Sequence, residues 1–231
     1  MKNFGYFKNT DPVLSGIKFG NWGSRPYEYF WAATILDAKD KNVLDLGTGL
    51  PSEHNWFNFV IETLNSKTYC GIDFDSRMKN EEINNDKCEM QWMDMSDLKF
   101  EDNSFDLIYS ISTFEHFDNE ECFMKSIKET HRVCKKDALM IVTLDEIWNI
   151  YNKDPIHSAW NELEKILIKN EKYDNSKVSF GMNNFINLIS EFFEPVELNE
   201  EDVKKTNANE SVLYSPVWNS SVSYGIFKVK K

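Results

Sequence analysis

The sequence has few cysteines and no long apolar run, and both scarcities exclude classes of protein. Its four cysteines are isolated, with no CxxC pair and no metal-ligand spacing, so we expect neither a disulfide framework nor a metal site. No apolar run approaches the roughly 20 residues that span a bilayer, and the first residues lack the apolar centre of a signal peptide. The sequence therefore predicts a cytoplasmic protein with free thiols and no membrane association.

Positive charge is also scarce. The chain has 26 Lys and Arg against 38 Asp and Glu, which gives a formal net charge of −12. Nucleic acids and anionic membranes bind positive surfaces, so this charge argues against both as partners. The composition, 41% hydrophobic and 28% charged, is that of a globular protein, and 231 residues suffice for one large α/β domain or, less naturally, two small domains.

Short apolar runs rich in β-branched residues alternate with helical patterns. Helical spacing predicts helices over Ser52–Leu64 and Asp118–Cys134, and Asp118 with Glu121 forms a capping box at the start of the second. This alternation predicts an α/β fold, with a mostly parallel, seven-stranded sheet and helices on both faces. The first five expected strands are Asn42–Leu46, Thr68–Ile72, Glu89–Met93, Phe105–Ile111 and Ala138–Leu144.

Residues 1–39 precede the alternating pattern and are rich in aromatic side chains. Ser24 is expected to cap a helix that has Pro26 in its first turn and runs to Leu36. Aromatic walls with a few polar groups are typical of small-molecule pockets. We therefore expect this segment to be a helical lid over the substrate.

The second region outside the pattern, residues 145–193, is expected to be a substrate-side insertion with helical patterns over 155–169 and 181–193. Residues 194–231 then supply the last two strands, Val196–Leu198 and Ser221–Val229. The second of these alternates in polarity and is predicted to be an antiparallel edge strand.

A glycine turn follows the first strand, in the segment Asp45-Leu-Gly47-Thr-Gly49. Such a turn between a strand and a helix lets the backbone approach a nucleotide. A dinucleotide fingerprint needs a third glycine where Ser52 stands. A carboxylate at Asp45 would repel a pyrophosphate but suits the sulfonium and ammonium groups of S-adenosylmethionine. The residues favour S-adenosylmethionine, and an NAD-dependent oxidoreductase or epimerase is the alternative.

Acidic residues also end the next two strands. Asp73 closes the second strand, where a carboxylate can accept both ribose hydroxyls, and Asp75 is expected to cap a following short helix. Asp94 follows the third strand and is placed to bond an adenine amino group, with Met95 against the ring. Loop acids and core methionines are the alternative interpretation of Asp94 and Met95.

As a set, these motifs resemble those of the class I S-adenosylmethionine-dependent methyltransferases over residues 40–145, the expected cofactor-binding core. The segments that carry the resemblance are Val43–Gly49, Gly71–Asp73, Asp94–Ile108, Phe114–His116 and Glu129–Asp137. The sequence departs from the family pattern at Pro51, where glycine is usual, and at Lys136-Asp137, where Pro-Gly is usual.

The resemblance implies a role for each cofactor residue. Asp45, Gly47 and Gly49 would contact the methionine end, and Ser110, at the end of the fourth strand, would make a backbone contact near it. Asp73 would bind the ribose. The adenine would meet Asp94 and Met95.

Methyl transfer depends on holding the nucleophile and the methyl group in line, and a hydroxyl nucleophile usually also needs a base, most often histidine. His116 lies just past the fourth strand and is the main candidate, with Glu115 beside it and Glu146 after the fifth strand. The alternative for each is a structural role. His54 is expected to be a surface or packing residue.

Substrate selection is expected in the N-terminal segment. Trp22, Arg25 and Tyr27 combine aromatic rings with one of the few arginines, a set that suits a carboxylate, a phosphate or a sugar ring. This segment is similar to that of methyltransferases found with glycan-modifying enzymes, so we predict a small-molecule acceptor, with a sugar or glycan-precursor hydroxyl as one candidate. A non-catalytic, methyltransferase-like binding module is the other alternative. The sequence leaves the oligomeric state open.

Overall fold

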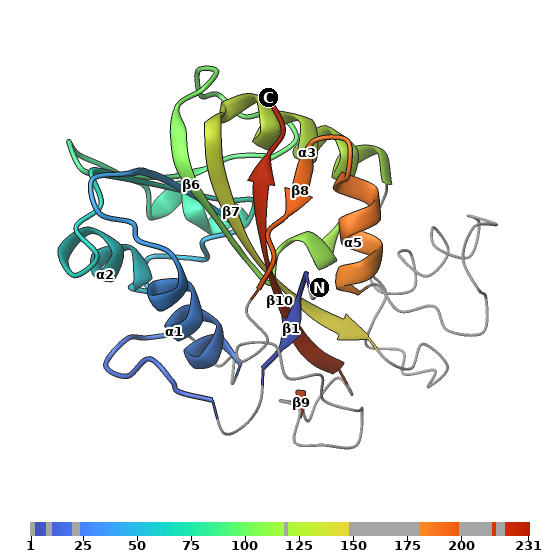
Figure 1. Cartoon of the computed structure of the whole chain (residues 1–231). Coiled ribbons are helices and arrows are strands. Elements are labelled where there is room, and N and C mark those ends of the chain that lie inside the picture. Colours follow the sequence, from blue (N-terminus) through green and yellow to red (C-terminus); the bar gives the residue numbers. More distant parts are fainter. Residues whose placement is uncertain are drawn as a thin grey trace.

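A computed structural model describes residues 3–7, 11–19, 24–117, 120–147, 181–198, 214–215 and 220–231. A twisted sheet runs through the middle of the molecule, and helices cover both of its faces (Figure 1). The expected helix over 155–169 and the capping residue Asp118 lie outside the described residues.

Five parallel strands form the centre of the sheet, and the order along it is β1-β10-β7-β6-β2-β3-β5-β4. The last strand, β10 (Ser220–Val229), pairs antiparallel with β7, which confirms the predicted antiparallel terminal strand. The parallel strands are β2 (Asn42–Leu46), β3 (Thr68–Asp73), β5 (Cys88–Trp92), β6 (Phe105–Ile111) and β7 (Cys134–Ile147).

The mostly parallel α/β class is confirmed, but the sheet of the described residues has ten strands where seven were expected. The additional strands are two residues long, too short to show an alternating pattern: β1 (Gly5–Tyr6), β4 (Ile83–Asn84) and β9 (Tyr214–Ser215).

Strand β10 is not an edge strand, which corrects the prediction. Strands β1, β8 (Phe193–Pro195) and β9 pair with successive parts of its second edge. The strand expected at Val196–Leu198 is also wrong, because β8 ends just before it. The backbone of Val196 still donates to the Ile226 carbonyl at 2.8 Å, so the chain leaves the sheet gradually.

Helices α1 (Arg25–Ile35) and α2 (Trp56–Glu62) cover one face of the sheet, and α3 (Glu120–Val133) and α5 (Met182–Ile189) cover the other (Figure 1). Each pair has its own apolar cluster: Tyr29 and Trp56 belong to the first, and Phe123 and Phe185 to the second. Two short 3-10 helices, η1 (Ser76–Asn80) and η2 (Phe114–His116), follow β3 and β6. Within the described ranges, no helix is long and apolar enough to cross a bilayer.

Part of the aromatic N-terminal segment belongs to the core. Phe7 is 2% exposed, and its ring contacts those of Trp31 and Tyr224. Phe19 is 6% exposed and stacks on Tyr29 at 5.1 Å. These rings fix α1 to the sheet, and the lid function of residues 1–39 stays a prediction.

Candidate cofactor and acceptor site

A pocket of about 600 Å³ opens at the carboxyl ends of β2, β3, β5 and β6. This is the edge of a parallel α/β sheet where ligands bind. Each of the four strand ends supplies lining residues, and α1 supplies Arg25 and Tyr29. The strand-end residues include Gly47, Thr48, Gly49, Ile72, Asp73, Phe74, Met93, Asp94, Met95, Ser112, Thr113 and His116.

The glycine turn after β2 forms one wall of the pocket, and both of its glycines are required by geometry. Gly47 and Gly49 have φ angles of +73° and +72°, a conformation that other residues adopt only with strain. A Cβ atom on Gly47 would collide with the Thr113 side chain, and one on Gly49 with the His54 ring. Glycine at both positions therefore lets the Thr113 and His54 side chains pack directly against the turn, and all four residues line the pocket.

Asp73 stands at the end of β3 with both carboxylate oxygens fixed. Oδ2 accepts from the Gly49 amide and Oδ1 from the Asp75 amide, each at 2.8 Å. A carboxylate oxygen accepts more than one hydrogen bond, so both remain able to accept from a ligand hydroxyl. Asp75 caps η1 by accepting from the Arg77 amide at 2.9 Å, as predicted.

Asp94 and Met95 follow β5 and line the same pocket. Phe74 lines it too; its side chain is 66% exposed, and its ring lies 5.6 Å from that of Trp92. Sequence reasoning missed Phe74, although its position directly after Asp73 was a usable signal. Exposed apolar rings beside a pocket suit the flat face of a base.

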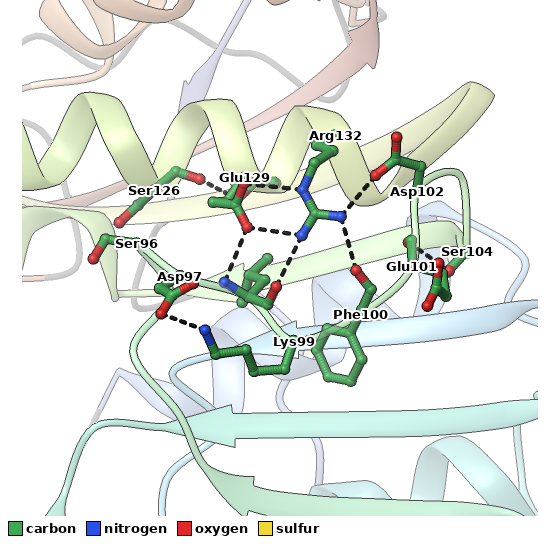
Figure 2. A network of polar contacts seen from close by, with 12 residues as sticks. Ser96, Asp97, Lys99, Phe100, Glu101, Asp102, Ser104, Ser126, Glu129 and Arg132 are labelled. Carbon is green, nitrogen blue, oxygen red and sulfur yellow. Dashed lines mark hydrogen bonds and ion pairs between the residues drawn. The ribbon is translucent and has the colours of Figure 1, made fainter.

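The loop that carries Asp94 and Met95 is tied to helix α3 by Arg132 (Figure 2). The Arg132 guanidinium donates to the carbonyls of Leu98 and Phe100, both at 2.8 Å. Glu129 accepts from the same guanidinium, at 2.7 and 2.9 Å, and also from the Leu98 amide at 3.0 Å. One side chain therefore fixes the loop between β5 and β6.

The comparisons with known proteins agree with this geometry. The family model described as "Methyltransferase domain" matches residues 44–142. This stretch contains the glycine turn, Asp73, Asp94 and the Arg132 network. Residues 44–142 match a methyltransferase domain, and their fold is the Rossmann-like fold of class I methyltransferases.

Solved structures resemble the chain in fold. A chain of the complex between the Haloferax volcanii Trm112 methyltransferase activator and a putative methyltransferase is 15% identical, with a TM-score of 0.57 and coverage of 90% of this chain and 92% of that one. A putative S-adenosylmethionine-dependent methyltransferase from Listeria monocytogenes is 12% identical, with a TM-score of 0.53. The match covers 88% of this chain and 99% of the Listeria chain. Haemonchus contortus phosphoethanolamine N-methyltransferase 2, solved with S-adenosyl-L-methionine, is 12% identical, with a TM-score of 0.54. The match covers 88% of this chain and 51% of the Haemonchus chain. The comparison with curated proteins gives no significant match.

Two of the predicted cofactor residues of the methyltransferase domain lie beneath the pocket and do not line it. Asp45 is 1% exposed and accepts from the Tyr69 hydroxyl at 2.6 Å. Burial raises the pKa of Asp45 to about 7 despite that bond. Ser110 is fully buried in β6, and Ser112 and Thr113 reach the pocket from the same strand end.

Of the three predicted catalytic residues, the structure brings His116 to the pocket. Burial, and then Arg25, lower the pKa of His116, so the neutral imidazole predominates near pH 7. Glu115 is 1% exposed; its Oε1 accepts from the Asp145 amide at 3.1 Å, and burial raises its pKa to about 7. Glu146 lies in β7 opposite Ser221, and its side chain lies outside the described part.

The predicted substrate residues separate in the structure. Arg25 lines the pocket and forms an ion pair with Glu28 at 2.7 Å. Tyr27 packs instead against the cluster around Phe7 and Tyr224, and Trp22 lies outside the described residues. His54, expected at the surface or in packing, is 8% exposed and lines the pocket beside Gly49.

Proposed function

We propose that this chain is an S-adenosylmethionine-dependent methyltransferase that acts on a small molecule. The observation that carries the proposal is the contact between the Asp73 carboxylate and the Gly49 amide. It joins the glycine turn and the acid of the next strand into one wall of one pocket. Both motifs that the family uses for this cofactor therefore face the same space.

The residues around the pocket fit the parts of S-adenosylmethionine. Asp73 would accept from the ribose hydroxyls, and Asp94 with Met95 and Phe74 would hold the adenine. The glycine turn, which lines the pocket at Gly47 and Gly49, would take the methionine end. Asp45 would support this turn from below, since it contacts the pocket through Tyr69 and Thr48.

A dinucleotide is a poorer fit for the same wall. Ser52, which replaces the third glycine, donates from both its amide and its hydroxyl to Glu81, each at 2.9 Å. Glu53 and Asp75 line the pocket nearby. A pyrophosphate would meet these carboxylates at short range, which is unfavourable.

The bound cofactor would supply a methyl group on a sulfonium, an electrophile that needs no further activation. The protein then has to exclude water, align the acceptor and remove its proton. His116 would take that proton, because its imidazole lines the pocket and its lowered pKa keeps it neutral at physiological pH.

The acceptor is proposed to be a small molecule, with a sugar or glycan-precursor hydroxyl as the candidate class. The pocket volume of about 600 Å³ and the polar Arg25 on its wall support a small polar acceptor. The net charge of −12 disfavours a nucleic acid in this role.

Calorimetry with S-adenosylhomocysteine tests the cofactor assignment, and micromolar binding is expected. Absence of binding at millimolar S-adenosylhomocysteine would refute the cofactor assignment. A radiolabelled-methyl screen against cell extract then tests catalysis. Binding of the cofactor without transfer to any component would identify a non-catalytic binding module.

A further inference from the structure

Glu28 is a carboxylate that the site described above does not use. It lies on α1 with 0% exposure and bonds three side chains, one on α1, one directly after β6 and one in β7. Its Oε1 accepts from Arg25 Nη1 at 2.7 Å, and its Oε2 accepts from the Ser112 hydroxyl at 2.7 Å and from the Thr143 hydroxyl. Helix α1 is thus joined to β7 and to the residue that follows β6 by one buried carboxylate.

The charge state of this group follows from its partners. Burial alone would raise the pKa of Glu28, but Arg25 and the two hydroxyls outweigh burial and lower it. Glu28 is therefore ionised and Arg25 is charged. A buried ion pair often contributes less stability than apolar residues of similar size would, so its presence favours a role in orienting the arginine.

The pair lies at the acceptor end of the pocket. Arg25 lines the pocket together with Ser112, Thr113 and His116, whereas Asp73 and Asp94 follow β3 and β5, on the other side of β2. The cofactor's adenosine would occupy the carboxylate-rich end. A cation held over β6 and β7 instead faces the space where the acceptor must approach the methyl group.

We propose that Glu28 is a positioning residue that holds Arg25 as the carboxylate-binding group of the acceptor site, so that the acceptor is a small molecule with a carboxylate, such as an acidic sugar. This inference rests on the proposed function. A guanidinium pairs with a carboxylate through two parallel hydrogen bonds, which fixes orientation as well as charge. Glu115 and Asp145 lie close enough to Arg25 to affect its pKa, and burial raises the pKa of each carboxyl to about 7, which limits their repulsion of an anion.

The test uses the whole chain saturated with S-adenosylhomocysteine, and two matched pairs of probes: glucuronate with glucuronamide, and benzoate with benzamide. The wild-type complex is expected to bind each acid at least tenfold more tightly than its amide. Arg25→Gln and Glu28→Gln should remove this preference, and Arg25→Lys should recover only part of it because lysine lacks the planar fork. Arg77→Gln, at the other end of the pocket, is the control and should keep the preference.

A purely structural role for Glu28 would change thermal stability but not the ratio of acid to amide affinity. If Glu28→Gln does not fold, Ser112→Ala and Thr143→Val each remove one hydroxyl while the ion pair stays, and each should lower the ratio about threefold or more. Equal affinity of the wild-type complex for acids and amides would overturn the inference.

A second experiment tests whether Arg25 binds the carboxylate of the acceptor or the carboxylate of the cofactor's amino-acid part. Affinities for S-adenosylhomocysteine and for 5′-methylthioadenosine, which lacks the amino-acid part, should both stay within threefold in Arg25→Gln. Loss of the first affinity alone would assign Arg25 to the cofactor and contradict the inference. Failure of the wild-type chain to bind S-adenosylhomocysteine would instead refute the proposed function.

Discussion

The Tyr69 hydroxyl donates to Asp45 Oδ2 at 2.6 Å, directly beneath the glycine turn. The same hydroxyl lies 2.7 Å from that of Thr48, which belongs to the turn. Asp45 Oδ1 is buried and has no hydrogen-bond partner among the described residues. A chain of three polar side chains therefore couples the first acidic residue of the motif to the turn that it precedes.

Replacing Tyr69 with phenylalanine should destabilise the protein by about 1–3 kcal/mol, because Asp45 Oδ2 and the Thr48 hydroxyl lose a buried partner. Urea unfolding measures this change, and S-adenosylhomocysteine affinity should fall about threefold to tenfold as the turn loosens. Tyr109→Phe is the matched control, since the Tyr109 hydroxyl is buried in the same cluster and has no hydrogen-bond partner in the described part of the chain. Equal losses in the two variants would show that the Tyr69–Asp45 bond contributes nothing.

The pKa of Asp45, raised by burial to about 7, predicts how stability depends on pH. In the unfolded chain this carboxyl titrates near its ordinary value of about 3.9, so the native state binds the extra proton between about pH 4 and pH 7. The stability that Asp45 contributes is therefore fully present below about pH 4, and it is lost as the pH rises to 7 and above. Asp45→Asn should flatten the decline measured by urea unfolding between pH 5.5 and pH 8, and an unchanged slope would argue against a protonated Asp45.

The strands of this fold are more predictable from sequence than the directions of its side chains. β2 and β6 have the predicted bounds because their β-branched and apolar runs are continuous. The same continuity hides which face each residue meets, because helices cover both sides of the sheet. The sequence therefore did not reveal that the Asp45 side chain is buried beneath the pocket, and the backbone contact expected of Ser110 stays a prediction.

Long-range contacts were the other part that the sequence could not reveal. Glu28 and Thr143 are 115 residues apart, and no local spacing links them. Asp137 illustrates the reverse case: the family's usual glycine is absent, yet Asp137 adopts a φ of +66°, a conformation that is uncommon for residues other than glycine.

Asp73→Ala should weaken S-adenosylhomocysteine binding about tenfold to a hundredfold, since it removes charge-assisted bonds to the ribose as well as the contact with Gly49. Asp75→Ala should have a much smaller effect, because its carboxylate caps η1 and pairs with the exposed Arg77. Calorimetry on both variants decides the point. Equal effects would contradict the assignment of Asp73 to the ribose.

Arg132→Met should release the loop that carries Asp94 and Met95, because the carbonyls of Leu98 and Phe100 lose their shared donor (Figure 2). We expect faster amide exchange over residues 94–104 and about tenfold weaker cofactor binding, or about 1.4 kcal/mol. Lys125→Met on the same helix removes an exposed pair with Glu121 and should change neither quantity. Normal exchange of the loop in Arg132→Met would show that the network does not hold it.

The final prediction separates two roles of the N-terminal segment by comparing Phe7 with Phe19. Both rings are buried, so Phe7→Ala and Phe19→Ala should each destabilise the protein by about 3–5 kcal/mol. Phe19, however, forms a β-bridge with His54 and stacks on Tyr29, and both of these partners line the pocket. Phe7 instead packs against Tyr224 of β10, in a separate cluster.

Calorimetry at low temperature, where both variants stay folded, should therefore give weaker S-adenosylhomocysteine binding for Phe19→Ala and unchanged binding for Phe7→Ala. The physical reason is that a cavity at Phe19 frees Tyr29 and His54 to move, while a cavity at Phe7 leaves the pocket walls in place. Equal losses of affinity would mean that the segment acts on the pocket through global stability alone. Deletion of residues 1–22 would then abolish cofactor binding together with folding, and a separate lid function for that part of the segment would be excluded.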